Sequence, residues 1–427
     1  MRLHICIVGP IATADIRHLL EGDTGRLPVG YSGAPLMVTL INELLRRGHR
    51  VTAVTLSGDM PLDWRQPARA SGSNLEVVFV PMRPRAWRPN GWQPGRIIDL
   101  YAFERRGLQY AIERATPDVV HAHWTYEFAL ATLNTSLPHL ITCHDAPAVV
   151  IRYTRSLYRV LRYFMARKVF RRGKVFSAVS GYMAHAAQRY TRLPVTVIPN
   201  PLADYVLASG RLRSAPSSSW QIGMICNGWG RLKNPEPALL AFEKIHHAYP
   251  TAVLHVFGAD FGPDEMAEQW CRDRNLAAGI VFHGATPHQQ LIEHLESLDL
   301  LIHPALEESF GVVLAEAMAL GIPIVAGRYS GAVPWVVGFD EKTASCGCAV
   351  LTDVTDVMAL VTAVDAALDK RYAERSAFGY KRARQLFTPD KVAEAYIRLY
   401  QNAMLQSPDL SNASSGAPAA EPGNSYL

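Results

Sequence analysis

Two glutamates spaced eight residues apart form the most suggestive chemical pattern in the chain. Glu308 follows an apolar run of strand length, and Glu316 lies about one turn into a segment with helical periodicity. Between them, Gly311 lets a backbone approach a ligand closely, and the free N–H groups of Val312 and Val313 can bind phosphate oxygens. A carboxylate accepts hydrogen bonds from two hydroxyls, which suits a ribose or a sugar. The alternative interpretation is an ordinary amphipathic helix with capping acids.

Histidines at the ends of predicted strands are a second candidate group. His144 ends one such strand and is followed by Asp145. His121 and His123 are spaced like metal ligands on one face of a strand, but no third ligand is evident. We therefore interpret these two as histidines of the core or of a cleft, and no metal site is expected.

The elements that must position these residues alternate between strands and helices. Helices are predicted at residues 35–47, which end at Gly48, and at 97–115, which stop before Pro117. The strand-length runs of the first half are residues 3–8, 51–56, 77–80, 119–122, 139–142, 175–179 and 195–198. Such alternation predicts an α/β fold with a parallel, doubly wound sheet.

A polar, turn-rich stretch at residues 208–219 separates this series from a second one. The later strand-length runs are residues 221–226, 252–257, 279–282, 300–303, 324–326 and 349–352. The pattern predicts two Rossmann-like domains, at 1–207 and 220–387, with the ligand in the cleft between them. A helix is predicted at 388–405, and residues 408–427 are expected to form a disordered tail because they are poor in apolar side chains.

Charge is divided unevenly between the two halves. Residues 1–203 contain 26 Lys and Arg against 13 Asp and Glu, whereas residues 204–427 contain 17 against 25. The segment 151–174 carries nine basic residues interleaved with aromatic and aliphatic ones. It is interpreted either as a docking surface for an anionic membrane or as the solvated face of an ordinary amphipathic helix. No recognised nucleic-acid motif is present.

Six cysteines in 427 residues are too few for a disulfide scaffold, and no uncharged apolar run reaches the ~18 residues of a membrane span. The expected location is therefore the cytoplasm, either free or at the inner face of the membrane.

Several motifs together resemble the retaining glycosyltransferases of family 4, which have the GT-B fold. Residues 308–323 (ESFGVVLAEAMALGIP) are similar to the E-x7-E motif of that family. The other resembling segments, in the expected order, are 118–124 (DVVHAHW), 142–145 (TCHD), 177–180 (SAVS), 197–201 (VIPNP) and 228–234 (GWGRLKN). The predicted helix at 388–405 resembles the terminal helix that crosses back to the first domain. The resemblance spans residues 3 to about 405 and implies two Rossmann-like domains facing a central cleft.

The resemblance also implies roles for individual residues. Glu316 would hold the ribose hydroxyls of a nucleotide donor, and Glu308 would contact hydroxyls of the transferred sugar. Lys233 would neutralise the departing diphosphate, and His144 would lie beside the donor sugar. The remaining donor-binding positions that it implies are Gly33, Thr286, Ser309, Phe310, Gly311, Val312 and Val313.

The chain departs from the family pattern in three places. The family's phosphate-binding arginine usually precedes the lysine by about five residues, where this chain has Gly228. Arg231 either replaces it or is a solvated loop charge. The family often has Gly-Gly where this chain has Ser32 and Gly33. It often has a glutamate near position 335, and Trp335 here either lines the sugar pocket or packs in the core.

The expected function is transfer of a hexose with retention, from a nucleotide diphosphate sugar to a glycan, a lipid-linked or a small-molecule hydroxyl. A UDP-sugar is favoured and a GDP-sugar comes next, in polysaccharide or cell-envelope assembly. No cofactor and no metal are expected, because no Asp-x-Asp motif occurs and Lys233 with helix dipoles can stabilise the diphosphate. Two rivals are a sugar-nucleotide epimerase of the same architecture and a non-catalytic protein that binds anions or membranes.

Overall fold

The first domain is built on one twisted sheet. The computed structural model describes residues 1–216, 219–343 and 345–406, and the tail predicted at 408–427 lies outside them. Within the described residues the strand order is β3-β4-β2-β1-β5-β6-β7-β8, and only β3 runs antiparallel to its neighbour. The strands are β1 (His4–Val8), β2 (Arg50–Ser57), β3 (Ala68–Gly72), β4 (Leu75–Pro81), β5 (Val119–His123), β6 (His139–Cys143), β7 (Phe176–Ala178) and β8 (Val195–Val197).

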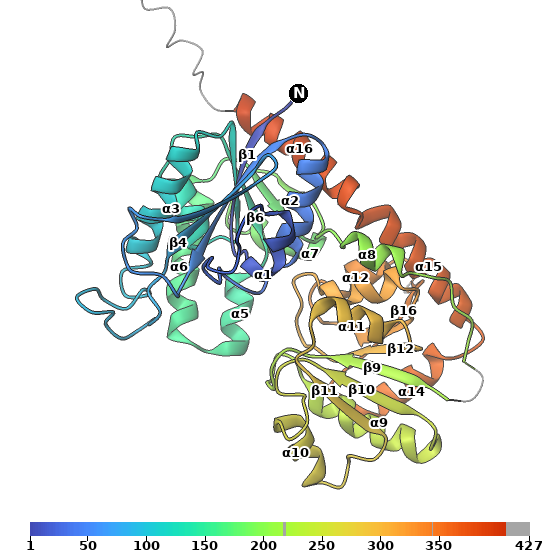
Figure 1. Cartoon of the computed structure of the whole chain (residues 1–427). Helices are drawn as coiled ribbons and strands as arrows, with labels where there is room; N and C mark the ends of the chain where they lie inside the picture. Colours follow the sequence, from blue (N-terminus) through green and yellow to red (C-terminus); the bar gives the residue numbers. More distant parts are fainter. Residues whose placement is uncertain (217–218, 344, 407–427) are drawn as a thin grey trace, which may run out of the picture.

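Helices cover this sheet because the side chains of its central strands, β1, β5 and β6, are buried on both faces. The side chains of Leu40 and Leu44, for example, lie on the buried stripe of α2. The helices of the first domain are α1 (Thr13–Ile16), α2 (Leu36–Arg46), α3 (Ala102–Ala115), α4 (Glu127–Thr132), α5 (Pro147–Thr154), α6 (Leu157–Arg172) and α7 (Gly181–Gln188). A further short helix, α8 (Asp204–Ala208), follows in the segment that crosses to the second domain (Figure 1).

The second domain repeats the plan with a smaller sheet, in the order β11-β10-β9-β12-β13-β16, in which all described neighbours are parallel. Its strands are β9 (Gln221–Ile225), β10 (Val253–Phe257), β11 (Ile280–Gly284), β12 (Leu300–His303), β13 (Ile324–Gly327) and β16 (Ala349–Thr352). Its helices are α9 (Pro235–Ala248), α10 (Met266–Arg272), α11 (His288–Leu295), α12 (Val312–Ala319), α13 (Val333–Val337), α14 (Val357–Ala367) and α15 (Tyr372–Leu386). The polar stretch predicted at 208–219 begins at the last residue of α8 and ends before β9.

The last described helix, α16 (Pro389–Leu405), leaves the second domain and packs on the first (Figure 1). Its Val392, Tyr396 and Tyr400 belong to the apolar core beneath β1 and α2. Tyr400 also hydrogen-bonds Nδ1 of His121 on β5, at 2.8 Å. The chain therefore passes between the domains twice, once after β8 and once through α16.

The two sheets present their carboxyl ends to the space between the domains. In each sheet the strand order changes direction, between β1 and β5 in the first and around β9 and β12 in the second. Ligands of such sheets bind outside the carboxyl ends of the strands at this switch point. The loops after β5, β6, β9 and β12 are therefore the elements that can build a site.

Some predicted elements have different bounds. The helix predicted from residue 97 starts only at Ala102, because Leu100 and Tyr101 adopt left-handed backbone conformations. The basic segment 151–174 is divided between two helices, α5 and α6, since Arg155 between them is also left-handed. The strand β3 and the short hairpin of β14 (Phe339–Asp340) and β15 (Ser345–Cys346) were not predicted.

Candidate active site

Two adjoining cavities lie between the domains, at the carboxyl ends of both sheets. The smaller has a volume of about 280 Å³, and the larger one of about 830 Å³. Gly33, Leu36 and Val312 line both. The smaller cavity contains most of the expected machinery, since it is also lined by His144, Lys233, Glu308, Ser309, Phe310 and Gly311. The larger one is lined by Val313 and Glu316 and extends along the crossing between the domains.

Lys233 and Glu308 form an ion pair on the wall of the smaller cavity. Lys233 Nζ lies 2.6 Å from Glu308 Oε1, and Nε2 of the buried His303 lies 3.4 Å from the same oxygen. Burial opposes ionisation of Glu308, but the neighbouring His303 ring and the Lys233 ammonium outweigh it and lower the pKa of Glu308 to about 2. The cavity thus holds a fixed anion beside a fixed cation.

The start of α12 separates the two cavities. Gly311 precedes the helix with φ of 77°, a left-handed conformation that favours glycine, and a Cβ there would meet Leu314 Cδ1 at 2.9 Å. The turn brings the first peptide N–H groups of the helix, at Val312 and Val313, to the cavity walls. From the opposite domain Gly33 faces the same walls with φ of 108°. An anionic group placed here would meet backbone N–H groups and the positive end of a helix dipole.

His144 lies on the first-domain wall of the smaller cavity and is neutral. Its Nε2 lies 2.8 Å from Nδ1 of His123, and its ring stacks on Trp124 with centroids 4.1 Å apart. Burial lowers the pKa of His144 to about 3, and burial also keeps the pKa of His121 and His123 well below the ordinary histidine value. A neutral imidazole can exchange hydrogen bonds with hydroxyls, but it does not supply a positive charge.

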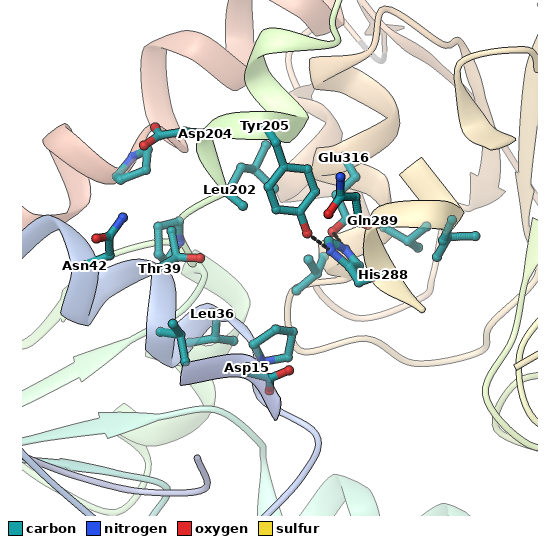
Figure 2. Close-up of a pocket in the computed structure, with 18 of the residues that line it drawn as sticks. Asp15, Leu36, Thr39, Asn42, Leu202, Asp204, Tyr205, His288, Gln289 and Glu316 are labelled. Atoms are coloured by element: carbon teal, nitrogen blue, oxygen red, sulfur yellow. Dashed lines mark hydrogen bonds and ion pairs between the residues drawn. The ribbon is translucent and has the colours of Figure 1, made fainter. Parts of the chain in front are cut away.

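Glu316 lies in the larger cavity, on the buried side of α12 (Figure 2). Its Oε1 accepts a hydrogen bond from Nε2 of His288 at 2.6 Å, and the other ring nitrogen of His288 contacts the hydroxyl of Tyr205. Figure 2 shows Asp15 and Leu36 of the first domain on the opposite side of the opening. The carboxylate expected to bind ribose is therefore already engaged by its own domain.

Direct contacts also join the domains around the smaller cavity. Ser180 Oγ, at the start of α7, donates a hydrogen bond to the carbonyl of Ser309 at 2.7 Å. The indole of Trp335 on α13 packs against Gly181, so closely that a Cβ added to Gly181 would lie 2.9 Å from it. Trp335 also contacts the ring of Phe310. Trp335 therefore packs between the domains and does not line either described cavity.

Two of the expected donor residues lie apart from the described cavities. Arg231 is exposed in the loop after β9 and lines neither of them. The hydroxyl of Thr286 donates a hydrogen bond to the carbonyl of Gly284 at 3.2 Å.

Several cavity residues were not found by sequence reasoning. They are His288, which contacts Glu316, Tyr205, which contacts His288, and also Asn227 and Trp124. A lone histidine at the start of a helix gives no functional signal. Trp124 could have been found, since it ends the DVVHAHW segment that was already singled out. In the described part of the chain no group of three or more His, Cys, Asp or Glu side chains is arranged to hold a metal ion.

Comparison with protein-family models assigns most of the chain to two families. Residues 35–203 match Glycosyltransferase Family 4, and residues 229–385 match Glycosyl transferases group 1. The match includes Lys233 and both glutamates in the second domain, and His144 in the first.

Individual proteins agree with these family matches. A GDP-mannose-dependent alpha-(1-6)-phosphatidylinositol monomannoside mannosyltransferase of Mycolicibacterium smegmatis is 31% identical over 59% of this chain and 61% of its own. A lipopolysaccharide core biosynthesis mannosyltransferase of Rhizobium meliloti is 32% identical over 35% of this chain and 42% of its own. The matched part thus spans about two to three fifths of these relatives.

A solved structure confirms the predicted fold class. Sucrose-phosphate synthase from Thermosynechococcus elongatus superposes with a TM-score of 0.70, covering 95% of this chain and 100% of the other, at 18% sequence identity. At this identity the likeness concerns the fold, which is two Rossmann-like domains facing a cleft. Fold, family models and relatives agree, and the chain belongs to the group 1 glycosyl transferases, with a first domain of the family 4 type.

Proposed function

We propose that the protein transfers a hexose, with retention of anomeric configuration, from a nucleoside diphosphate sugar to a hydroxyl acceptor. One observation carries the proposal: Glu308, Lys233 and the start of α12 line one cavity, and Glu316 lines the cavity that adjoins it. This order matches the order of sugar, diphosphate and ribose in the donor. The comparisons do not favour an epimerase or a non-catalytic binding protein.

In the proposed pose, different residues of the two cavities bind the ribose, the diphosphate and the sugar of the donor. The ribose hydroxyls donate to Glu316, the diphosphate meets Lys233 and the N–H groups of Val312 and Val313, and the sugar lies between Glu308 and His144. Lys233 stabilises the negative charge that develops on the leaving diphosphate, so the proposed reaction needs no metal. Closing the cleft over donor and acceptor supplies proximity and excludes water.

Retention is proposed to occur on one face of the sugar, without a protein nucleophile. The acceptor oxygen bonds the anomeric carbon as the carbon–oxygen bond to the diphosphate breaks, and the acceptor proton passes to the departing phosphate oxygen. Glu308 is held by Lys233, and His144 is neutral and hydrogen-bonded to His123, so neither is poised to attack. Their proposed role is to hold the sugar hydroxyls.

The donor base is proposed to be uracil or guanine. Family frequency favours UDP, whereas the M. smegmatis relative is named as GDP-mannose-dependent, which supports GDP. The acceptor is proposed to enter on the first-domain side of the smaller cavity, beside Trp124 and Tyr153. It is a glycan, a lipid-linked or a small-molecule hydroxyl compound in polysaccharide or cell-envelope assembly.

An anionic membrane surface is proposed as a partner, contacted through the exposed face of α5 and α6. Arg167 and Lys168 are exposed there, and so are Leu157 and Phe164. Arg162 does not contribute to this face, because it is buried and pairs with Glu127 at 3.0 Å. In the part of the chain that the structure describes, no helix has the length and apolar character needed to span a bilayer.

The experiment is a thermal-shift panel of UDP, GDP, ADP and dTDP with their common sugars, on wild type and Glu316→Ala. A ligand at 100 times its Kd should add ~2.7 kcal/mol to the stability. We expect one nucleotide to stabilise wild type and to lose this effect in Glu316→Ala. Glu293→Ala is the matched control, because Glu293 is exposed on α11. No stabilisation of wild type by any nucleotide would contradict the proposed function.

A further inference from the structure

A line of three side chains fixes the carboxylate of Glu316 in the structure. His288 at the start of α11 bonds Glu316 Oε1 through Nε2 at 2.6 Å, and its Nδ1 contacts the hydroxyl of Tyr205 on α8. Figure 2 shows these two contacts on the same wall of the larger cavity. Glu316 is 4% exposed, so its partners within the protein decide how it is oriented. Side chains from α8, α11 and α12 thus form one chain of contacts that ends at the carboxylate of Glu316.

The charges around His288 favour its protonated form. Burial acts against protonation, but the hydrogen bond and charge of Glu316, together with the charge of Asp15, raise the pKa of His288 above the ordinary histidine value. Burial raises the pKa of Tyr205 to about 12, so the tyrosine stays neutral. Glu316, Tyr205 and Asp15 are the titratable groups that act on this ring. A protonated ring donates from both nitrogens, to Glu316 and to the Tyr205 oxygen.

Such a contact leaves Glu316 able to bind a ligand. A carboxylate has about four acceptor positions, so a histidine on Oε1 leaves capacity for the hydroxyls of a ribose. A buried carboxylate without a partner would instead tend to take up a proton and lose that capacity. Tyr205 also restricts the position of the His288 ring. Tyr205 lies on α8, directly after the segment that crosses between the domains, and Pro201, Leu202 and Ala203 of that segment line the same cavity.

We propose that His288 is a positioning residue for the nucleotide donor: it keeps Glu316 ionised and oriented for the ribose, and Tyr205 holds its ring in place from the crossing between the domains. This inference rests on the proposed function, because it requires a ribose at Glu316. It adds a residue whose type and position gave no signal in the sequence.

The test measures ribose recognition itself. Isothermal titration calorimetry compares the nucleoside diphosphate that stabilises wild type with its 2′,3′-dideoxy analogue, on wild type, His288→Ala and His288→Gln. We expect wild type to prefer the ribonucleotide by roughly ten-fold or more, and His288→Ala to lose most of this preference. His288→Gln should retain part of it, because an amide can donate to Glu316 and accept from Tyr205. His247→Gln, on the exposed face of α9, is the control and should resemble wild type.

A pH series separates positioning from a general structural role. As the pH rises through the raised pKa of His288, the hydrogen bond to Glu316 loses its charge, so the wild-type preference for the ribonucleotide should fall several-fold. The preference in His288→Gln should not depend on pH in the same range. Tyr205→Phe should shift the pH at which the preference for the ribonucleotide falls, because it removes the hydroxyl that contacts Nδ1 of His288.

The outcomes distinguish the inference from the function on which it rests. Absence of nucleotide binding by wild type would overturn both. Three results would overturn the inference alone, given that wild type binds the nucleotide: no preference for ribose in wild type, an unchanged preference in His288→Ala, or an equal loss of both nucleotides in His288→Ala and His288→Gln. The last result would mean that His288 only supports the fold of the cavity.

Discussion

At the scale of single residues, the ion pair of Lys233 and Glu308 gives the first prediction, which concerns the role of Lys233 in catalysis. In Lys233→Ala the diphosphate would lose the cation nearest to it, and we expect kcat to fall by about two to three orders of magnitude. The donor should still bind through Glu316, so KM should change much less. Steady-state kinetics with the donor found in the nucleotide panel measure both constants.

Lys244→Ala is the control for Lys233→Ala, since Lys244 is exposed on α9 away from both cavities. A Lys233→Ala enzyme with wild-type kcat would show that another group neutralises the leaving diphosphate. Arg231 would then be the first residue to examine, because it lies in the same loop.

His144 supports a second prediction, concerning proton binding. Its pKa is lowered to about 3 by burial, whereas an unfolded chain binds the proton near the ordinary value of about 6.5. Between these values the unfolded state holds more protons, so native stability should fall as the pH falls, by up to about 1.4 kcal/mol per pH unit from this residue. Above pH 6.5 the contribution of His144 should be constant.

Urea unfolding of wild type and His144→Asn at pH 7.5 and 5.5 measures this effect. We expect the variant to lose less stability between the two pH values than wild type. In NMR spectra the ring of His144 should also not titrate between pH 5 and 8. A midpoint near 6.5 would mean that the side chain reaches solvent in the free enzyme.

At the scale of elements, Gly311 connects a strand-end loop to a helix in a conformation that other residues avoid. Gly311→Ala would place a Cβ against Leu314 and strain the backbone at φ of 77°, so we expect a loss of about 1–3 kcal/mol in stability. Because the start of α12 would shift, the donor KM should rise as well. Thermal unfolding and donor kinetics measure the two effects. Gly230→Ala should be nearly neutral, since no atom lies within 4 Å of a Cβ there.

The same scale shows which features the sequence could predict. The buried parallel strands of both domains were predictable because their apolar runs are continuous and bounded by polar turns. The break between α5 and α6 was not, since Arg155 and Ser156 are neither glycine nor proline. The start of α3 was missed for a related reason, because the left-handed Leu100 and Tyr101 give no local signal.

The residues of the candidate site also divide into those that the local sequence predicts and those that it does not. Glu308, Gly311 and Glu316 lie on one short segment whose spacing could be recognised, and the structure places all three on cavity walls. His288 is 28 residues from Glu316, and Tyr205 is 83 residues from His288. A pairing over such distances between common residue types is set by tertiary structure, so a single sequence does not reveal it.

At the scale of the whole molecule, charge is segregated by domain, and this leads to the last prediction. The basic face of α5 and α6 belongs to the domain that is proposed to bind the acceptor. Each Lys or Arg near an anionic membrane is worth about 1 kcal/mol, so removing two should weaken binding by roughly thirty-fold at moderate salt. We therefore expect Arg167→Glu combined with Lys168→Glu to abolish most binding to anionic vesicles.

Sedimentation with phosphatidylglycerol-rich and with purely zwitterionic vesicles, over a range of salt concentrations, tests this prediction. Wild type should bind only the anionic vesicles and should dissociate as salt rises, because screening shortens the reach of exposed charges. Lys370→Glu combined with Lys381→Glu makes the same charge change on exposed positions of the second domain and should leave binding nearly intact. Equal loss in both double variants would mean that net charge alone drives attachment. No binding by wild type would mean that the basic face of α5 and α6 is simply solvated, and that the acceptor reaches the cleft from solution.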